Sequence, residues 1–131
     1  MNPFLLTFLY YLAAIAVVIA GLIIFELMTR KYKDWEEIQS NNAAVALSIA
    51  GKIVGTCIIL TFSILHNDTI LETVVWGLFG LALQFLAYFL FEVLTPRFSV
   101  EQQLKERNTA VGIISCAVSI GLAFVIGASI T

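Results

Sequence analysis

Apolar residues fill four long segments of this chain, and polar residues gather mostly in the connections between them. The segments run from about Phe4 to Leu27, Ala43 to Leu65, Ile70 to Phe91 and Thr109 to Ile130. A membrane-spanning helix needs about 20 apolar residues, and each segment reaches that length. Lipid leaves the backbone groups of an open strand unsatisfied, so the spans are helical. The pattern predicts an all-α, polytopic membrane protein whose single domain, 1–131, has four transmembrane helices.

The composition supports a chain that lies in the lipid bilayer. Of the 131 residues, 60% are hydrophobic and 12% are charged, and the mean hydropathy is +0.98. A soluble domain carries about 25% charged residues, so that class is excluded. The chain also lacks the basic face that a nucleic-acid-binding protein needs, so nucleic acid is not an expected partner.

The positions of the cations predict the orientation of the spans. Six cations lie in the first and third connections: Arg30, Lys31, Lys33, Arg97, Lys105 and Arg107. The N-terminal tip, the short 66–69 turn and the C-terminus contain no lysine or arginine. The positive-inside rule therefore places both charged loops in the cytoplasm and both termini outside. These cations are also candidates for contact with anionic lipid or a cytoplasmic partner protein.

Both charged loops contain signals for a helix start before the membrane begins. Asp34 and Ser99 are each followed, three residues on, by Glu37 or Gln102, which is a capping pattern. Two arrangements follow from it. In the first, Trp35 and Ile38, or Val100 and Leu104, lie against the lipid headgroups. In the second, the loop helices simply extend the second and fourth spans into the cytoplasm.

The sequence aligns with itself without a gap when 10–65 is placed on 76–131. In this alignment, which we call the repeat register, Phe25-Glu26-x-x-Thr29 falls on Phe91-Glu92-x-x-Thr95, and Asn42 falls on Asn108. The polar identities are informative because apolar residues match easily by chance. We expect two helical-hairpin repeats, about 4–65 and 70–131. Each has an even number of spans, so they are parallel and related by a pseudo-twofold axis along the membrane normal.

The polar residues in register form a candidate cluster at the cytoplasmic end. Its members are Glu26, Glu92, Asn42, Asn108, Thr29 and Thr95. One interpretation is a clamp in which each carboxylate contacts the asparagine of its own hairpin, with the threonine assisting. The alternative is a ring of acids that concentrates cations at a pore mouth.

Lys52 lies within the second span, about 15 Å from its start and so near the bilayer midplane. Inserting a lysine at that depth costs roughly 2.5–3.5 kcal/mol, so its ammonium group needs polar partners inside the protein. Ser48 and Thr56 lie one turn to either side, and Gln84 on the third span has a comparable depth. We expect Lys52 and Gln84 to face each other or share a water cavity. They form either a site for an anion, a proton or a small polar solute, or a satisfied packing contact.

The lysine has no polar counterpart in the second repeat, where Val118 occupies the matching position. By contrast, Gly51-x-x-x-Gly55 matches Ala117-x-x-x-Gly121, which predicts the same close helix contact twice. The aromatic residues of the third span are expected to face lipid or the interface. They are Phe79, Phe85, Tyr88, Phe89 and Phe91.

No pattern of catalytic or metal-binding residues is present in the sequence. Cys57 and Cys116 lie at different depths, so a disulfide is not expected. His66 stands near Asp68 and Glu72 in the outer turn, where a solvated turn is favoured over a metal site. We therefore expect no enzyme activity, no cofactor and no metal.

The sequence NNAAVALSIAGKIVG enters the second span and RNTAVGIISCAVSIG enters the fourth. With the duplicated hairpins, these segments resemble the YjfL-type bacterial inner-membrane proteins, a family of unknown function built from duplicated two-helix units. The resemblance covers essentially the whole chain. It implies a location in the bacterial plasma membrane and brings no reaction, ligand or catalytic residue. Such proteins look associated with envelope maintenance under membrane stress.

Two functions of different classes remain compatible with the sequence. The first is an oligomeric channel or transporter for a small solute or ion, with Lys52 and Gln84 inside. Four helices enclose little space, so this function needs a homo-oligomer. The second is a membrane scaffold whose basic loops recruit a partner protein or anionic lipid.

Overall fold

The computed structural model describes residues 2–28, 34–93 and 100–130 as helices joined by short turns. Its elements are α1 (Pro3–Met28), α2 (Asp34–Gln39), α3 (Ala43–His66), α4 (Ile70–Val93), α5 (Val100–Lys105) and α6 (Thr109–Ser129). Four of these helices, α1, α3, α4 and α6, are long and apolar enough to cross a membrane. The predicted all-α fold with four spans is therefore confirmed.

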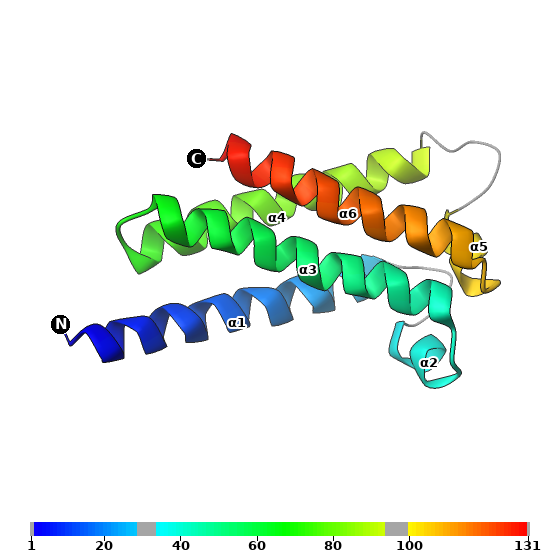
Figure 1. The fold of residues 1–131 in the computed structure, drawn as a ribbon, viewed down its shortest axis with the longest axis horizontal. Coiled ribbons are helices and arrows are strands. Elements are labelled where there is room, and N and C mark those ends of the chain that lie inside the picture. The colour runs from blue at the N-terminus through cyan, green and yellow to red at the C-terminus, as the bar shows by residue number, and fades with distance from the viewer. Residues whose placement is uncertain (1, 29–33, 94–99, 131) are drawn as a thin grey trace.

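The four long helices run side by side, and their directions alternate along the chain (Figure 1). Both termini and the α3–α4 turn lie at one end of the bundle, and α2 and α5 lie at the other. The two charged connections thus share one end, as the orientation argument requires. Which end faces the cytoplasm stays a prediction.

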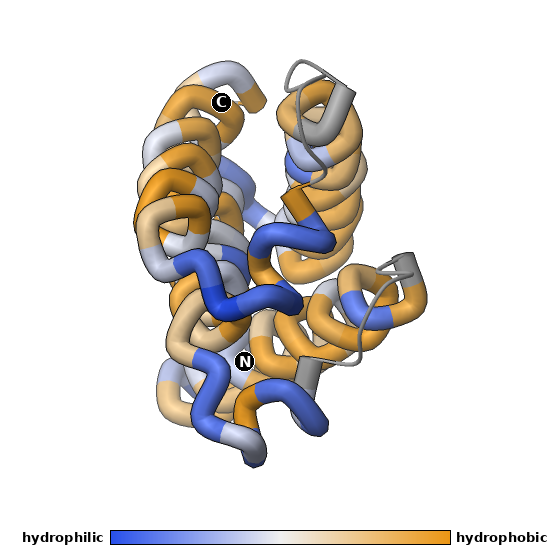
Figure 2. The backbone as a smooth tube through the Cα atoms, turned by 90° about the vertical axis from the view of Figure 1, so that its right-hand side faces the viewer, coloured by the Kyte–Doolittle hydropathy of each residue, from blue (hydrophilic) through white to orange (hydrophobic). Residues whose placement is uncertain are grey.

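Helix α3 is the central element, because it contacts each of the other five helices. In an apolar stretch of 18 residues within α3, 56% of the residues are buried. The corresponding share is 17% in α1, 22% in α4 and 33% in α6. Elsewhere the long helices expose large apolar side chains, such as Phe4, Phe79 and Phe124. Seen from the α2–α5 end, the long helices are mostly hydrophobic, whereas hydrophilic residues gather at the near end (Figure 2). This distribution is that of a protein surrounded by lipid.

Helices α2 and α5 are separate from the spans that follow them. The chain turns at Asn41 and Arg107, whose φ angles are 64° and 67°. Left-handed residues end a helix, so α3 and α6 start anew two residues later. A straight extension of these spans into the cytoplasm is therefore wrong.

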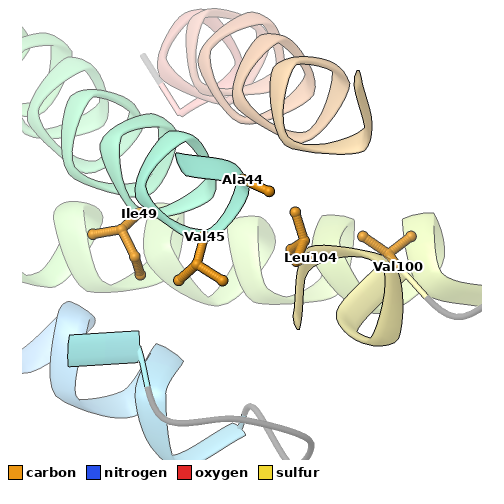
Figure 3. Packing of buried hydrophobic residues seen from close by; sticks show 5 residues of the cluster. All are labelled: Ala44, Val45, Ile49, Val100 and Leu104. Atoms are coloured by element: carbon orange, nitrogen blue, oxygen red, sulfur yellow. The ribbon is translucent and has the colours of Figure 1, made fainter. Parts of the chain in front are cut away.

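The short helix α5 packs against the beginning of α3. Val100 and Leu104 are buried with Ala44, Val45 and Ile49 in one apolar cluster (Figure 3). Val100 and Leu104 therefore contribute to the protein core, and their predicted contact with lipid headgroups is wrong. Trp35 on α2 is 51% exposed and remains available for such contact.

Candidate functional site

Asn42 organises the junction between α2 and α3. Its side-chain oxygen accepts a hydrogen bond from the Val45 amide (3.2 Å), which caps α3. Its Nδ2 atom donates to Glu37 Oε2 (3.1 Å) and to the Leu104 carbonyl on α5 (2.9 Å). Asn42 is fully buried, so these bonds are shielded from water. The junction joins the ends of both hairpins through one amide.

Asn108 occupies the corresponding junction between α5 and α6. It caps α6 by accepting a hydrogen bond from the Val111 amide (3.3 Å), and its Nδ2 donates to Gln103 Oε1 (2.8 Å). The repeat register that pairs the two asparagines also pairs Glu37 with Gln103. The same capping geometry therefore occurs at both junctions, with a carboxylate in one and an amide in the other.

The predicted clamp between Glu26 and Asn42 is wrong. Asn42 bonds to the loop acid Glu37, because a cap residue directs its side chain toward its own helix start and the preceding turn. Glu26 is half-buried at the end of α1. Thr29, Thr95 and the side chain of Glu92 lie outside the described residues, so the second clamp and the ring of acids stay predictions.

Lys52 lies in the interior of the bundle, 7% exposed. Its Nζ atom is 5.2 Å from the centroid of the Phe25 ring on α1 and 5.4 Å from that of Tyr88 on α4. Both distances are within the range of cation–π attraction, which strengthens when the ammonium is desolvated. The ring of Phe25 also packs edge-on against Tyr88 and Phe85. Two aromatic rings, one from α1 and one from α4, thus lie beside the lysine, and Phe85 supports the Phe25 ring.

Gln84 is 1% exposed, and its Nε2 atom donates to the Ser119 carbonyl on α6 (2.9 Å). Its other polar atom, Oε1, is buried without a hydrogen-bond partner among the described residues. The Tyr88 hydroxyl is hydrogen-bonded to the Ser119 hydroxyl. Because the Tyr88 ring also lies beside Lys52, Tyr88 connects Lys52 to the residue that Gln84 contacts. The structure therefore brings Lys52 and Gln84 into one polar cluster through Tyr88 and Ser119.

The predicted stripe along α3 is buried as a whole. Thr56 donates to the Lys52 carbonyl (2.8 Å) and Ser48 accepts a hydrogen bond from Ser115 on α6 (3.4 Å). We call the following residues the polar cluster: Ser48, Lys52, Thr56, Gln84, Tyr88, Ser115 and Ser119. It lies where α3, α4 and α6 meet, around the middle of α3.

Sequence reasoning found Gln84 but missed the other residues that α4 and α6 contribute to the cluster, namely Tyr88, Ser115 and Ser119. Ser115 and Ser119 lie one turn apart on α6, and Ser119 also bonds the Ser115 carbonyl (2.9 Å). Their spacing was a usable signal. Phe85 and Tyr88 were expected to face lipid or the interface, but both pack against Phe25 inside the bundle, and Tyr88 lies beside Lys52. Phe79 and Phe89 are exposed as expected. One helical turn separates Tyr88 from Gln84, which places both on one face.

Small residues allow a close contact between α3 and α6. A Cβ atom at Gly51 would lie 2.8 Å from Cys116 Cα, so only glycine allows this approach of the two helices. A Cβ atom built at the matching Gly121 would meet no neighbouring atom within 4 Å, and Ala117 is exposed. The prediction that both motifs make the same contact within the chain is wrong, because α3 and α6 meet through different faces. A pseudo-twofold axis, which would join identical faces, does not describe this contact.

The charged loops are described only in part. Arg107 donates from Nη2 to the Ser40 carbonyl (2.8 Å) and hydroxyl (3.2 Å), which links the two junctions. Lys105 is exposed. The remaining loop cations, Arg30, Lys31, Lys33 and Arg97, lie outside the described residues.

The described ranges contain no group of three or more His, Cys, Asp or Glu side chains that could hold a metal ion. The two cysteines, Cys57 and Cys116, are free thiols. His66 donates from Nδ1 to the Phe62 carbonyl (2.9 Å) within its own helix.

Known proteins extend this description. Residues 1–130 match DUF350, a Domain of Unknown Function. The chain is 43% identical over 121 residues to the UPF0719 transmembrane protein YshE of Bacillus subtilis (strain 168), which covers 92% of this chain and 90% of that protein. No solved structure matches the chain. The narrower resemblance to YjfL-type proteins stays a prediction. By its full-length match and its four spans, this chain belongs to the DUF350 family of transmembrane proteins.

Proposed function

We propose that this protein is a channel- or transporter-like membrane protein that binds a small polar solute or ion at the polar cluster. The observation that supports this most is the pairing of a buried lysine with a buried amide oxygen that lacks a partner among the described residues. Each group carries a cost at midplane depth, about 2.5–3.5 kcal/mol for the lysine and about 1–3 kcal/mol for an unsatisfied acceptor. A polar guest that satisfies the amide oxygen would offset the second cost.

The chemistry of the cluster suits a small polar guest. Gln84 Oε1 is an acceptor that a water, a hydroxyl or an N–H group of a solute would satisfy. The Lys52 ammonium, placed over two aromatic rings, supplies positive charge to the same region. The hydroxyls of Tyr88 and Ser119 lie between them. The cluster has a binding role in this proposal and no catalytic one.

We place the α2–α5 end in the cytoplasm and both termini outside, in a bacterial plasma membrane. The loop cations support this orientation through the positive-inside rule. Helix α3 is packed on several sides, so the interior of one chain is filled with side chains. A continuous path for a solute therefore requires several copies.

The test is solute and ion flux into liposomes that contain the purified protein. Lys52→Met and Gln84→Leu should each reduce flux at least tenfold while the helical circular dichroism is retained. Lys105→Met makes the same chemical change at an exposed site and should leave flux unchanged. Equal flux in the wild-type protein and both cluster variants would overturn the proposal, as would the absence of any flux above empty liposomes.

A further inference from the structure

Helices α3 and α6 meet through two different faces. On α3 the contact uses Ala44, Gly51 and Gly55, which we call the glycine face. On α6 it uses Gly112, Cys116, Ser119 and Ala123, which we call the serine face. Cβ atoms built at Gly51 and Gly55 would lie 3.1 Å from Ser119 Cβ and 3.4 Å from Ala123 Cβ, and one at Gly112 would lie 2.8 Å from Ala44 Cα. The two backbones are therefore in close contact along several turns.

The repeat register places the glycine face a second time on α6. Ala110, Ala117 and Gly121 take the places of Ala44, Gly51 and Gly55. All three α6 residues are exposed, and a Cβ at Gly121 would meet nothing within 4 Å. The small residues that allow close packing on α3 are thus repeated on α6, where no helix in the described part of the chain covers them.

The same register, read from α6 back to α3, places the serine face a second time on α3. Ala46, Ala50, Ile53 and Cys57 take the places of Gly112, Cys116, Ser119 and Ala123. Ala50 and Cys57 are exposed, and Ala46 and Ile53 are half-buried. Each chain therefore carries an occupied pair of complementary faces and a second pair of matching positions that is open on α6 and partly open on α3.

The two faces lie on nearly opposite sides of a helix. In α3 numbering, Gly51 packs against the position of Ile53, and Gly55 against the position of Cys57. This constant offset of two residues corresponds to about 200° around a helix. The α3–α6 contact is therefore heterologous, so it leaves a free face on each side and can be repeated. It also joins helices that run in the same direction, so repeated copies keep one orientation in the membrane (Figure 1).

We propose that copies of this protein associate head to tail in the membrane, with the open glycine face on α6 of one copy packed on the open serine face on α3 of the next. The occupant is a second copy because this chain already supplies both halves of the contact and shows their packing. Small residues on both faces suit a helix partner, since they let two backbones approach in lipid. The proposal deepens the oligomer that the proposed function requires, but it does not depend on solute binding.

The packed helix pair predicts a specific cross-link between copies. Within one chain, Gly55 contacts Ala123. In the repeat register their counterparts are Gly121 and Cys57, so between copies Gly121 of one chain contacts Cys57 of the next. The 3.4 Å Cβ separation of the contact within the chain is close to the mean of about 3.8 Å found in disulfides. In a Cys116→Ser background, Gly121→Cys should therefore form an intermolecular disulfide with the native Cys57 when membranes are oxidised. A head-to-tail contact gives a ladder of dimers and larger species on a nonreducing gel.

The matched control adds Cys57→Ser to Gly121→Cys and should abolish the ladder. A second pair, Ala117→Cys with Ile53→Cys in a chain without native cysteines, follows from the 3.1 Å contact of Gly51 with Ser119 and should give the same ladder. Monomers from both pairs would overturn the proposal. Dimers without larger species, or cross-links that persist in the Cys57→Ser control, would overturn it in favour of an isologous contact.

This outcome is separable from the proposed function. Lys52→Met, which should reduce flux at least tenfold, leaves both open faces intact and should retain the ladder. A ladder without flux in the wild-type protein overturns the channel and keeps the assembly, whereas flux without a ladder overturns this assembly.

Discussion

The two junction asparagines offer a matched test, because they perform the same capping role in different surroundings. Asn42→Ala removes a helix cap, worth about 1 kcal/mol, and a buried hydrogen bond to the Leu104 carbonyl, worth about another 1 kcal/mol. The Leu104 carbonyl keeps the Arg107 amide as a partner, so no full desolvation penalty is added. We expect the free energy of unfolding to fall by about 2–3 kcal/mol.

Asn108→Ala should cost less. Asn108 is half-buried, and apart from its cap it donates to the Gln103 side chain. A cap of about 1 kcal/mol and a partly solvated bond together give a loss of about 1–1.5 kcal/mol. Equilibrium unfolding in detergent micelles, followed by helical circular dichroism, measures both losses. Equal losses for the two alanine variants would refute the account of the Asn42 contacts.

Aspartate substitutions sharpen the comparison. Aspartate keeps the capping oxygen and suits a helix N-terminus, so Asn108→Asp beside neutral Gln103 should cost less than about 0.5 kcal/mol. Asn42→Asp instead places a second carboxylate next to Glu37 and loses the donor to Leu104, so it should be at least as destabilising as Asn42→Ala. Adding Glu37→Gln to Asn42→Asp should recover part of the lost free energy of unfolding. A stable Asn42→Asp protein would contradict the hydrogen-bond assignment.

Five further substitutions, at four positions, test other contacts by the same unfolding assay. Gly112→Ala should destabilise the protein by about 1–3 kcal/mol, because its Cβ would meet the backbone of Ala44 at 2.8 Å, whereas Gly121→Ala in detergent-separated monomers should stay within about 0.5 kcal/mol. Tyr88→Phe keeps the ring over Lys52 and loses the contact with Ser119, so it should cost about 1 kcal/mol, and Tyr88→Leu should cost more. Arg107→Gly should be nearly neutral, because relief of the left-handed φ of 67° offsets the exposed bond to Ser40. A loss above about 1.5 kcal/mol for Arg107→Gly would mean that this bond matters more than its exposure suggests.

Much of the fold could be predicted from the sequence, because bilayer thickness fixes the length of each span. The predicted bounds agree with the helices within a few residues at each end. The place of Lys52 near the middle of its span was also predictable, since it follows from the bounds of the apolar segment alone. What the pattern did not contain was which face of each helix meets which neighbour. Lipid-facing and protein-facing positions are both apolar in a membrane protein, so the hydrophobic periodicity that orients soluble helices is weak here.

That missing information explains the errors at the site. Phe85 and Tyr88 look like the exposed Phe79 and Phe89 by residue type, and only the packing of α1 against α4 turns the first pair inward. Likewise, Asn42 was assigned to Glu26 because both stand at a span end in each half. The break at Asn41, with its positive φ, instead brings Glu37 back to the cap.

The difference between the two halves follows from the heterologous contact. Ser48, Lys52 and Thr56 lie on a face of α3 that is buried in the bundle. The repeat register places Ile114, Val118 and Leu122 at these positions in α6, where Ile114 is 55% exposed and the others are half-buried. A polar side chain is tolerated only where the protein surrounds it, and lipid contact requires an apolar one. If α3 and α6 met through the same face, the matching positions of both helices would be equally buried, and both helices could carry polar residues such as Ser48, Lys52 and Thr56. Because α3 is the inner helix of the pair, it alone keeps the stripe. Unequal burial of the two hairpins therefore explains why the second one has no polar counterpart of Lys52.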